Sequence, residues 1–534
     1  MGRILVRLGF VTEATIRDML SETGDAKVVD LRNISVDPDV LARVPIDVAK
    51  QYNIFPINYD EVKKMISIAV ANPNDLLLAD QIRAFLGGDY DLEFMVAEES
   101  EISRAVDEYY GLELTIEGIL REIETGEEAE TSSLQGEGSS NPIVRLVNAF
   151  MNDAVKRGAS DIHFEPEESF LRVRYRIDGV LRQIRSLHRS YWNSMAVRLK
   201  VMSEMNIAES RLPQDGRISF TLYGRIVDFR VACQPTTHGE NFVMRIFDQQ
   251  RNISKVENLG LNQKAEKMLH LIMARPTGVL MVTGPTGSGK TTTLYSIVQH
   301  LNNVGVNIMT LEDPVEYPLP MIRQSAVSEN TKMDWASGIK SLLRQDPDIL
   351  LIGEVRDNET AELVFRAAMT GHVVLTTLHT NSAIGVIPRL TDMGVLPDIM
   401  ATNISGIVAQ RLVRKLCVKC KRKKENLSDL DKAVLPKLYP DVDFKKSLIQ
   451  ELVGCAVCEY QGYRGRAAVM ELLRFNDELD EMISQRATIK EFRDRASQAG
   501  LFFSMAESGA EKVVSGETSL EEIGRVVDLT PYMN

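Results

Sequence analysis

One eight-residue segment constrains the fold of this chain more than any other: residues 284–291 read Gly-Pro-Thr-Gly-Ser-Gly-Lys-Thr. They match the phosphate-loop pattern G-x-x-x-x-G-K-[ST] at every specified position. The apolar run 278–283 before the segment favours a buried strand, and residues 291–300 after it favour a helix. In such a turn the glycines let backbone N–H groups face an anion, and the helix N-terminus adds partial positive charge. The sequence therefore predicts a nucleoside triphosphate site on an α/β fold.

The pattern also assigns roles within the loop. Lys290 is expected to reach the β- and γ-phosphates of the nucleoside triphosphate, and the Thr291 hydroxyl is expected to ligate Mg²⁺. The residues expected to bind the nucleotide are Gly284, Pro285, Thr286, Gly287, Ser288, Gly289, Lys290, Thr291 and Thr292.

Beyond residue 256, short apolar runs alternate with helical stretches, which is typical of a parallel sheet with crossover helices. The runs are 279–283, 307–311, 349–353 and 372–376. The last three are followed by Glu312, Glu354 and His379, respectively. Strand ends of a parallel sheet carry its ligands. Phosphoryl transfer to water needs one carboxylate to orient the nucleophile and another for the Mg²⁺ shell. The sequence thus places candidates for both beside the loop, with a histidine in position to contact the γ-phosphate.

Two C-x-x-C pairs predict a metal centre. The pairs are Cys417 with Cys420 and Cys455 with Cys458. Two such knuckles complete a tetrahedral Cys₄ site for structural zinc, and four protein ligands leave no open position for catalysis. A redox dithiol or a chance match is the alternative. The fifth cysteine, Cys233, lies in a strand-like run and is expected to be a small buried hydrophobe.

A chain of 534 residues is expected to form several domains. We expect a small α/β domain over 1–120 and a flexible linker over 121–141, which is acidic and rich in Gly and Ser. A second N-terminal α+β domain is expected over 142–255. An ATPase domain follows over 256–534, with a zinc-binding insertion at about 415–460 and a helical C-terminal part.

The net charge of −13 disfavours general nucleic-acid binding, which needs a basic surface. No apolar run approaches the roughly 18–20 residues that span a bilayer, and the N-terminal apolar stretch is too short for a signal peptide. We therefore expect a protein that stays in the cytoplasm unless a partner holds it at a membrane. One basic run interrupts the acidic background. It either neutralises the zinc thiolates or contacts anionic lipid or an acidic partner. Its members are Arg411, Arg414, Lys415, Lys419, Lys421, Arg422, Lys423 and Lys424.

These motifs together resemble the secretion ATPases of type II secretion and type IV pilus assembly. Residues 312–316 are similar to the family's Asp box, 344–357 to its Walker B motif and 371–379 to its His box. The paired C-x-x-C motifs and the Gly-Tyr-Arg-Gly-Arg stretch behind them also match. Residues 159–165 and 211–217 are similar to the family's second N-terminal domain.

The resemblance implies a RecA-like P-loop ATPase domain behind a PAS-like second N-terminal domain. It implies ATP hydrolysis that drives pilin or pseudopilin assembly by a homo-hexamer. This ring would be docked on inner-membrane platform and cytoplasmic-docking proteins. By this resemblance, Glu312 of this chain would be the catalytic base, Glu354 would act on Mg²⁺ and His379 would sense the nucleotide state. Arg211, Arg217 and Arg225 would act as arginine fingers across the domain cleft.

Three other functions are considered beside the assembly ATPase. Residues 2–11 loosely resemble part of the cyclic-di-GMP-binding motif of some relatives, which would make the chain a cyclic-di-GMP-responsive pilus ATPase. A pilus-retraction motor is disfavoured by the Cys₄ insertion and the long N-terminal region, and a DNA-conjugation motor by the acidic balance. The choice between secretion and pilus assembly is left to other observations.

Overall fold

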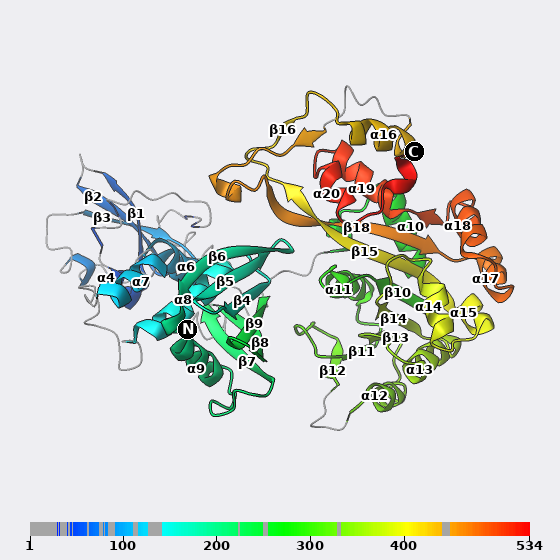
Figure 1. The fold of residues 1–534 in the computed structure, drawn as a ribbon, viewed down its shortest axis with the longest axis horizontal. Coiled ribbons are helices and arrows are strands. Elements are labelled where there is room, and N and C mark those ends of the chain that lie inside the picture. The colour runs from blue at the N-terminus through cyan, green and yellow to red at the C-terminus, as the bar shows by residue number, and fades with distance from the viewer. Residues whose placement is uncertain are drawn as a thin grey trace. The chain divides into compact units, whose positions relative to one another are not determined.

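The computed structural model describes residues 141–222, 225–248, 255–327, 333–440 and 449–533. Before these it describes shorter pieces, mainly 46–60, 64–73, 81–83, 91–110 and 116–125. Residues 2–11, which bear the cyclic-di-GMP resemblance, lie outside the described residues. The chain divides into two compact units, Met1–Gln250 and Arg251–Asn534 (Figure 1). No helix in the described ranges is both long and apolar enough to cross a membrane.

The first unit begins with a small three-stranded sheet. Strand β1 (Phe55–Asp60) runs antiparallel to β2 (Met65–Val70), and β2 runs parallel to β3 (Asp91–Val96). Helices α4 (Ile46–Tyr52) and α6 (Glu99–Tyr110) accompany it. The apolar residues of β2 and of both helices share one buried core. This part of the chain therefore has the small α/β fold expected from the sequence.

Helix α7 (Ile116–Thr125) belongs with the next domain rather than with this sheet. Ile116 and Ile119 are buried in the same cluster as residues of α8 (Pro142–Lys156). The predicted domain boundary at residue 120 falls inside α7, and the first five residues of the predicted linker are helical. The rest of that linker, residues 126–140, lies outside the described residues.

The second domain is a six-stranded antiparallel sheet in the order β6-β5-β4-β9-β8-β7. Its core includes apolar residues of α8 and of α9 (Trp192–Met202). Along β5 buried and partly exposed positions alternate, so arginines occupy the opposite face. The strands are β4 (Asp161–Pro166), β5 (Phe170–Ile177), β6 (Val180–His188), β7 (Gln214–Leu222), β8 (Arg225–Thr236) and β9 (Gly239–Asp248).

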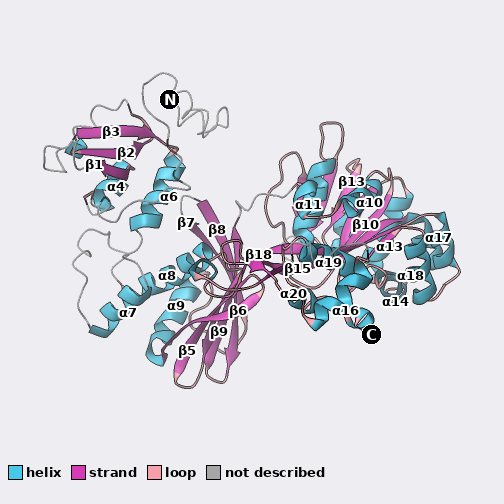
Figure 2. Ribbon diagram, turned by 90° about the horizontal axis from the view of Figure 1, so that it is seen from above, coloured by secondary structure: helices cyan, strands magenta, loops and turns pink. Residues whose placement is uncertain are grey.

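The second unit is built on an eight-stranded sheet in the order β12-β11-β13-β14-β10-β15-β18-β19 (Figure 2). The first six strands pair in parallel, as the alternating pattern predicted. These six are β10 (Gly278–Thr283), β11 (Ile308–Glu312), β12 (Arg323–Ala326), β13 (Ile349–Ile352), β14 (Val373–Leu378) and β15 (Ile404–Leu416).

Helices cover both faces of this sheet. Leu280 and Val282 of β10 share a core with α10 (Gln263–Met273) and α11 (Lys290–Leu301). Val279 and Met281 share the other core, with α12 (Trp335–Leu342), α13 (Asn358–Met369), α14 (Val386–Asp392) and α15 (Pro397–Asn403). This alternation shows that β10, which leads into the phosphate loop, is buried on both sides.

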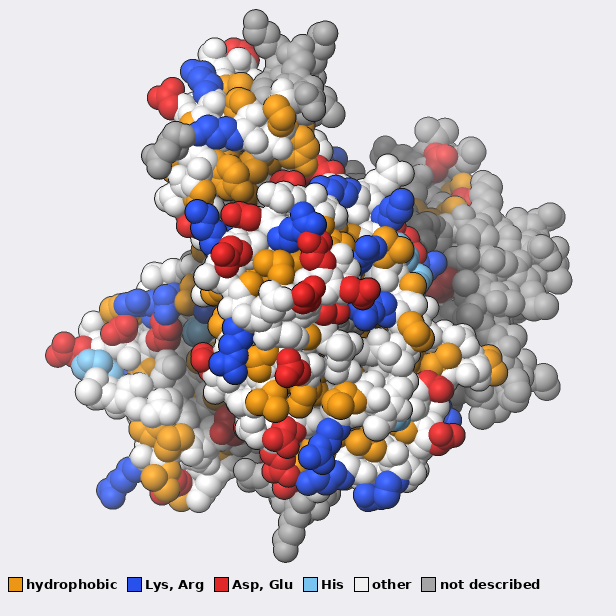
Figure 3. All heavy atoms as spheres, turned by 90° about the vertical axis from the view of Figure 1, so that its right-hand side faces the viewer, with side chains coloured by type: hydrophobic (Ala, Val, Ile, Leu, Met, Phe, Trp, Pro, Cys, Tyr) orange, Lys and Arg blue, Asp and Glu red, His pale blue; other side chains and the backbone are white. Residues whose placement is uncertain are grey.

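Strand β15 forms a long antiparallel pair with β18 (Tyr463–Arg474). The insertion that carries the four cysteines connects these two strands in the sequence. The insertion contains β16 (Arg422–Lys423), α16 (Asp429–Leu438), β17 (Gln450–Glu451) and the 3₁₀ turn Ala456–Cys458. The C-terminal part contains α17 (Asp477–Ser484), α18 (Ile489–Gln498), β19 (Phe502–Phe503), α19 (Met505–Val514) and α20 (Leu520–Gly524). On the face shown in Figure 3, acidic, basic and hydrophobic side chains are interspersed.

Candidate functional site

The phosphate loop joins β10 to α11 and needs its glycines. Gly284, Gly287 and Gly289 have φ angles of 150°, 78° and 89°, which L side chains rarely adopt. Space is also lacking at two of them. A Cβ on Gly284 would lie 2.5 Å from the carbonyl oxygen of Gln410, and one on Gly289 would lie 2.7 Å from the side-chain nitrogen of Gln410. The loop is thus packed against β15.

The side chain of Gln410 holds the phosphate loop to β15 through two hydrogen bonds. Its Nε2 donates to the Ser288 carbonyl at 2.7 Å, and its Oε1 accepts from the Thr293 hydroxyl at 2.6 Å. No sequence motif singles out Gln410. Its signal in the sequence is a glutamine directly after the stretch 404–409, which pairs with β10.

Lys290 closes the loop on itself. Its Nζ donates to the carbonyls of Gly284 (2.9 Å) and Pro285 (3.2 Å). Burial lowers the pKa of Lys290, Glu354 opposes that shift and Arg411 adds to it. The Ser288 hydroxyl is buried without a hydrogen-bond partner among the described residues, whereas Thr291 and Thr292 are exposed at the helix start. A partly desolvated ammonium beside an unpartnered hydroxyl is an environment that favours a bound anion.

Glu354 and His379 meet beside this loop. Glu354 follows β13, and its carboxylate lies 3.6 Å from Nε2 of His379, which follows β14. Arg356 forms an ion pair with the other carboxylate oxygen. Since Glu354 also acts on the pKa of Lys290, the three predicted residues share one site. The parallel pairing of β13, β14 and β10 brings their carboxyl ends together.

Glu312 lies at the end of β11 in a different environment. Its side chain is 4% exposed, and three donors serve its carboxylate. The Thr310 hydroxyl donates at 2.6 Å, Gln324 Nε2 donates at 3.2 Å and the Tyr295 hydroxyl donates to the second oxygen. Burial and the neighbouring Glu312 raise the pKa of Tyr295. In this conformation Glu312 is held in a hydrogen-bond network rather than turned to solvent.

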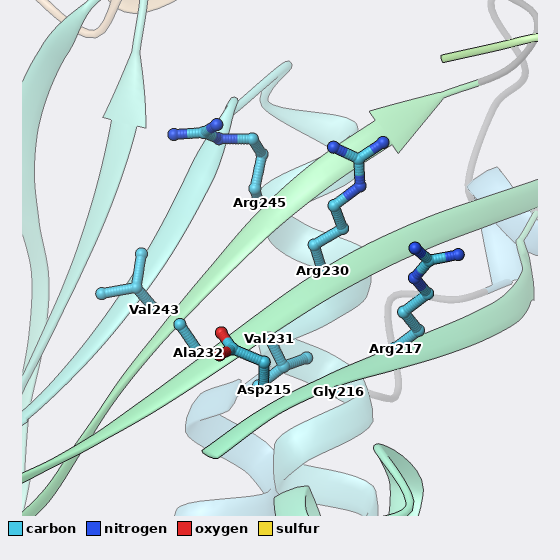
Figure 4. Close-up of a pocket in the computed structure, with 8 residues that line it drawn as sticks. All are labelled: Asp215, Gly216, Arg217, Arg230, Val231, Ala232, Val243 and Arg245. Atoms are coloured by element: carbon cyan, nitrogen blue, oxygen red, sulfur yellow. The ribbon is translucent and has the colours of Figure 1, made fainter. Parts of the chain in front are cut away.

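The predicted arginine fingers separate in the structure. Arg217 lies opposite Arg230 in the β7–β8 register, and Arg230 lies opposite Arg245 in the β8–β9 register. Figure 4 shows these three side chains on adjacent strands along a pocket of about 450 Å³. Arg211 is exposed in the preceding loop, outside this row. The side chain of Arg225, at the start of β8, lies outside what the structure describes. We call Arg217, Arg230 and Arg245 the arginine row.

Carboxylates lie near the arginine row. Asp161 of β4 lies opposite Arg245 and forms ion pairs at 3.3 Å with both Arg245 and Arg176. The row therefore combines three guanidinium groups with two nearby carboxylates, since Asp161 pairs with Arg245 at one end and Asp215 lines the same pocket. An anion with several oxygens matches such a surface.

The four predicted cysteines converge at the base of the insertion. Their Sγ atoms all lie within 4.8 Å of one another, and three of the Sγ–Sγ separations are 3.8–4.0 Å. A tetrahedral site with Zn–S bonds of about 2.3 Å requires sulfur separations of about 3.8 Å. Backbone N–H groups of Gly454, Cys455 and Gly462 donate to these sulfurs at 3.2–3.3 Å. Such donors stabilise thiolates, so the residues fit a bound Zn²⁺.

Comparison with known proteins agrees with this geometry. The family model described as type II/IV secretion system protein matches residues 136–525, and the MshEN domain model matches residues 25–116. The chain belongs to the type II/IV secretion system protein family. The resemblance drawn from the motifs is thereby confirmed.

Relatives of this secretion family cover nearly the whole chain. The type IV pilus assembly ATPase PilB of Myxococcus xanthus is 39% identical over 98% of this chain and 93% of its own length. Type II secretion system protein E of Xanthomonas campestris is 38% identical over 98% and 92%. The solved ATPase DotB of Legionella pneumophila is 19% identical, with a TM-score of 0.52 over 71% of this chain and 94% of that one. The last similarity shows the fold alone.

Proposed function

We propose that the site at the phosphate loop hydrolyses ATP and that this hydrolysis drives assembly of pilin or pseudopilin subunits. The chain is an ATPase of the secretion family, and the relatives named above include a pilus assembly ATPase and a type II secretion protein. The observation that carries the site is the convergence of Lys290, Glu354 and His379 at the ends of adjacent parallel strands.

In this proposal residues 284–292 bind the phosphates, with Lys290 leaving its two carbonyl partners for the β- and γ-oxygens. The Thr291 hydroxyl and Glu354 hold Mg²⁺, directly or through water. The metal neutralises phosphate charge when it is bound. His379 reports the presence of the γ-phosphate to Glu354. Lys290→Ala tests the site: ATP hydrolysis by the full chain should be lost while its thermal stability is kept. An unchanged steady-state rate would remove the proposal.

Glu312 acts as the water-orienting base in the same proposal. Its three donors give it a fixed position, and it must exchange at least one of them for water to serve that role. The arginine row supplies the fingers that stabilise charge on the transferring phosphoryl group. Arg217 is common to the predicted set and the row, whereas Arg211 and Arg225 remain predictions from the family resemblance.

The proposed assembly is a homo-hexameric ring in the cytoplasm, docked at the inner membrane through platform and docking proteins. The phosphate loop and the arginine row lie in different units of the chain, so turnover requires closure within one subunit or between neighbours. We assign residues up to about 115 to partner docking, about 116–248 to the arginine-bearing domain and 256–534 to the ATPase domain.

The Cys₄ centre is proposed to hold one structural Zn²⁺ and to present its knuckle tip, defined as Val418, Val457 and Tyr460, to anionic lipid. Val418 and Tyr460 are 79% and 76% exposed. Of the predicted basic run, Arg414, Lys415, Arg422 and Lys424 instead pair with carboxylates. Lys419 lines a pocket together with Val418 and Val457 of the tip. Binding of Val418→Asp to phosphatidylglycerol vesicles should be weaker than binding of wild type, with phosphatidylcholine vesicles as the control.

A second candidate concerns the first domain. We propose as this candidate that the domain binds cyclic-di-GMP. The MshEN domain model matches residues 25–116, and residues 2–11, which carry the cyclic-di-GMP resemblance, precede that range. Calorimetric titration of the full chain with cyclic-di-GMP tests it. No heat of binding at micromolar ligand would contradict this candidate and leave the ATPase proposal untouched.

A further inference from the structure

A second cation of the ATPase domain lies beside the phosphate loop, and none of the roles assigned so far uses it. Arg411 follows Gln410 on β15, and its Nη1 lies 3.3 Å from the position that a Cβ on Gly284 would occupy. Nη1 also donates to the Gln410 carbonyl at 3.0 Å. Burial lowers the pKa of Arg411, while Glu471 on β18 opposes the shift. A half-buried guanidinium in this place binds to protein acceptors rather than to water.

The other end of the guanidinium reaches the segment that carries His379. Nη2 of Arg411 donates to both the carbonyl oxygen and the side-chain oxygen of Asn381, each at 3.1 Å. Asn381 lies two residues after His379. The neighbouring Thr380 is tied to the end of β10, because its N–H donates to the Thr283 hydroxyl at 2.8 Å. Segment 379–381 is therefore held from two strands, by Thr283 on one side and by Arg411 on the other.

Beyond this segment a buried acid continues the contact. Glu471 accepts the N–H of Ala383 at 2.6 Å. Burial raises the pKa of Glu471, while that N–H, Arg493 and Arg411 oppose the rise. The turn 379–383 is thus fixed at Asn381 by a cation and at Ala383 by a carboxylate, both from the β15–β18 pair.

We infer that Arg411 is a positioning residue of the ATP reaction, which holds His379 in place relative to the phosphate loop through Asn381. The inference rests on the proposed role of His379. Arginine suits the task because its planar fork serves the acceptors of Gln410 and Asn381 at once, whereas lysine offers a compact point charge. A displacement of about 1 Å in an active site costs on the order of 100-fold in rate.

Arg411→Ala and Arg411→Lys in the full chain test this inference. For Arg411→Ala we expect kcat to fall about 10- to 100-fold, with KM for ATP and nucleotide affinity nearly unchanged, and Arg411→Lys to fall less. Added guanidinium ion should restore part of the Arg411→Ala rate. The matched control is Arg495→Ala, whose guanidinium pairs with Glu478 on the surface, and its rate should equal that of wild type.

A double-mutant cycle with His379→Ala separates positioning from a merely structural role. If Arg411 acts through His379, adding Arg411→Ala to His379→Ala should lower kcat little further. Full additivity, or a loss of rate that tracks a loss of thermal stability without guanidinium rescue, would overturn the inference. If His379→Ala alone leaves turnover unchanged, the proposed role of His379 fails, and the coupling fails with it. Loss of hydrolysis in Lys290→Ala would still uphold the site itself.

Discussion

Nε2 of His379 lies 3.6 Å from Oε2 of Glu354, while Arg356 pairs with Oε1 of the same carboxylate. Each carboxylate oxygen of Glu354 therefore faces one basic side chain from a segment that follows a strand of the parallel sheet. The carboxylate is held in one orientation beside the loop without being sealed off, because it remains partly exposed. In the proposed site, Glu354 is thus the carboxylate that lies close to both Lys290 and His379.

The first prediction concerns that charge. Glu354→Gln should bind ATP about as well as wild type, since the phosphate contacts come from the loop, but should hydrolyse it at least about 100-fold more slowly. Nucleotide titration and steady-state ATPase assays measure the two effects. Glu359→Gln is the matched control, because Glu359 pairs only with Lys340 on the surface. Weakened binding with a normal rate at saturating ATP would reassign Glu354 to affinity.

Glu312 should behave differently because it is buried and fully hydrogen-bonded. Glu312→Gln places an amide where three donors converge, so at least one donor loses its acceptor. We expect a loss of about 1–3 kcal/mol in the free energy of unfolding in addition to slower hydrolysis. Denaturant unfolding measures the first effect. A variant as stable as wild type would show that the network around Tyr295 does not form in solution.

The arginine row should matter only for turnover. Arg217→Ala, Arg230→Ala and Arg245→Ala should each cut kcat strongly, by up to about 10³-fold, while ATP binding is largely kept. Arg172→Ala is the control, because Arg172 lies on the same sheet but pairs with Glu167 at 2.8 Å. Equal rates for the row and the control would mean that the row is a solvated face of the sheet.

The metal centre yields a measurable stoichiometry. Purified protein should carry about one Zn²⁺ per chain, and Cys455→Ser should lose it and destabilise the insertion more than the ATPase core. Metal analysis and limited proteolysis of the insertion check both statements. Four freely reactive thiols in folded, zinc-free protein would contradict the assignment.

A half-buried acid in α17, Asp480, predicts a pH dependence of stability. Burial raises the pKa of Asp480 to about 6, so the folded state binds its proton more tightly than the unfolded chain does. The contribution of Asp480 to the free energy of unfolding is fully present below about pH 4 and is lost as the pH rises through 6. Asp480→Asn should therefore raise the Tm at pH 8 by about 2–4 °C, from about 1 kcal/mol after allowance for screening. At pH 4 the Tm should not change.

The control for this prediction is Asp494→Asn in the exposed face of α18, which should leave the Tm unchanged at both pH values. An equal rise of the Asp480→Asn Tm at pH 4 and pH 8 would show that helix propensity, rather than proton binding, causes the effect.

Much of the ATPase domain follows from local sequence. The phosphate-loop pattern, the apolar runs and the C-x-x-C spacing can each be recognised because residues close together in the sequence form the corresponding structure. The expected boundary at residue 120 rests on the composition of the linker, whereas Ile116, Ile119 and Ile123 of α7 pack in the core of the second domain. Composition does not show this packing.

Other features depend on strand register, which the sequence does not display. Gln410 and Arg411 stand far along the chain from Gly284, and only the parallel pairing of β10 with β15 brings them to the loop. The arginine row likewise needs the alignment of β7, β8 and β9. Arginines 13 and 15 positions apart in sequence become neighbours only when the hairpins form.

Strand β15 has a mechanical consequence. It begins beside β10, passes Gln410 under the phosphate loop and ends at Leu416, directly before Cys417 of the metal centre. Its pairing is irregular at two places, between Ile404 and Gly406 opposite β10 and between Arg414 and Leu416 opposite β18. Seven residues of extended chain span about 23 Å, so one continuous strand connects the phosphate loop to the metal centre. If an anchored partner pulled on the knuckles, β15 would transmit the force to the phosphate loop. The rate of ATP hydrolysis would then depend on that force.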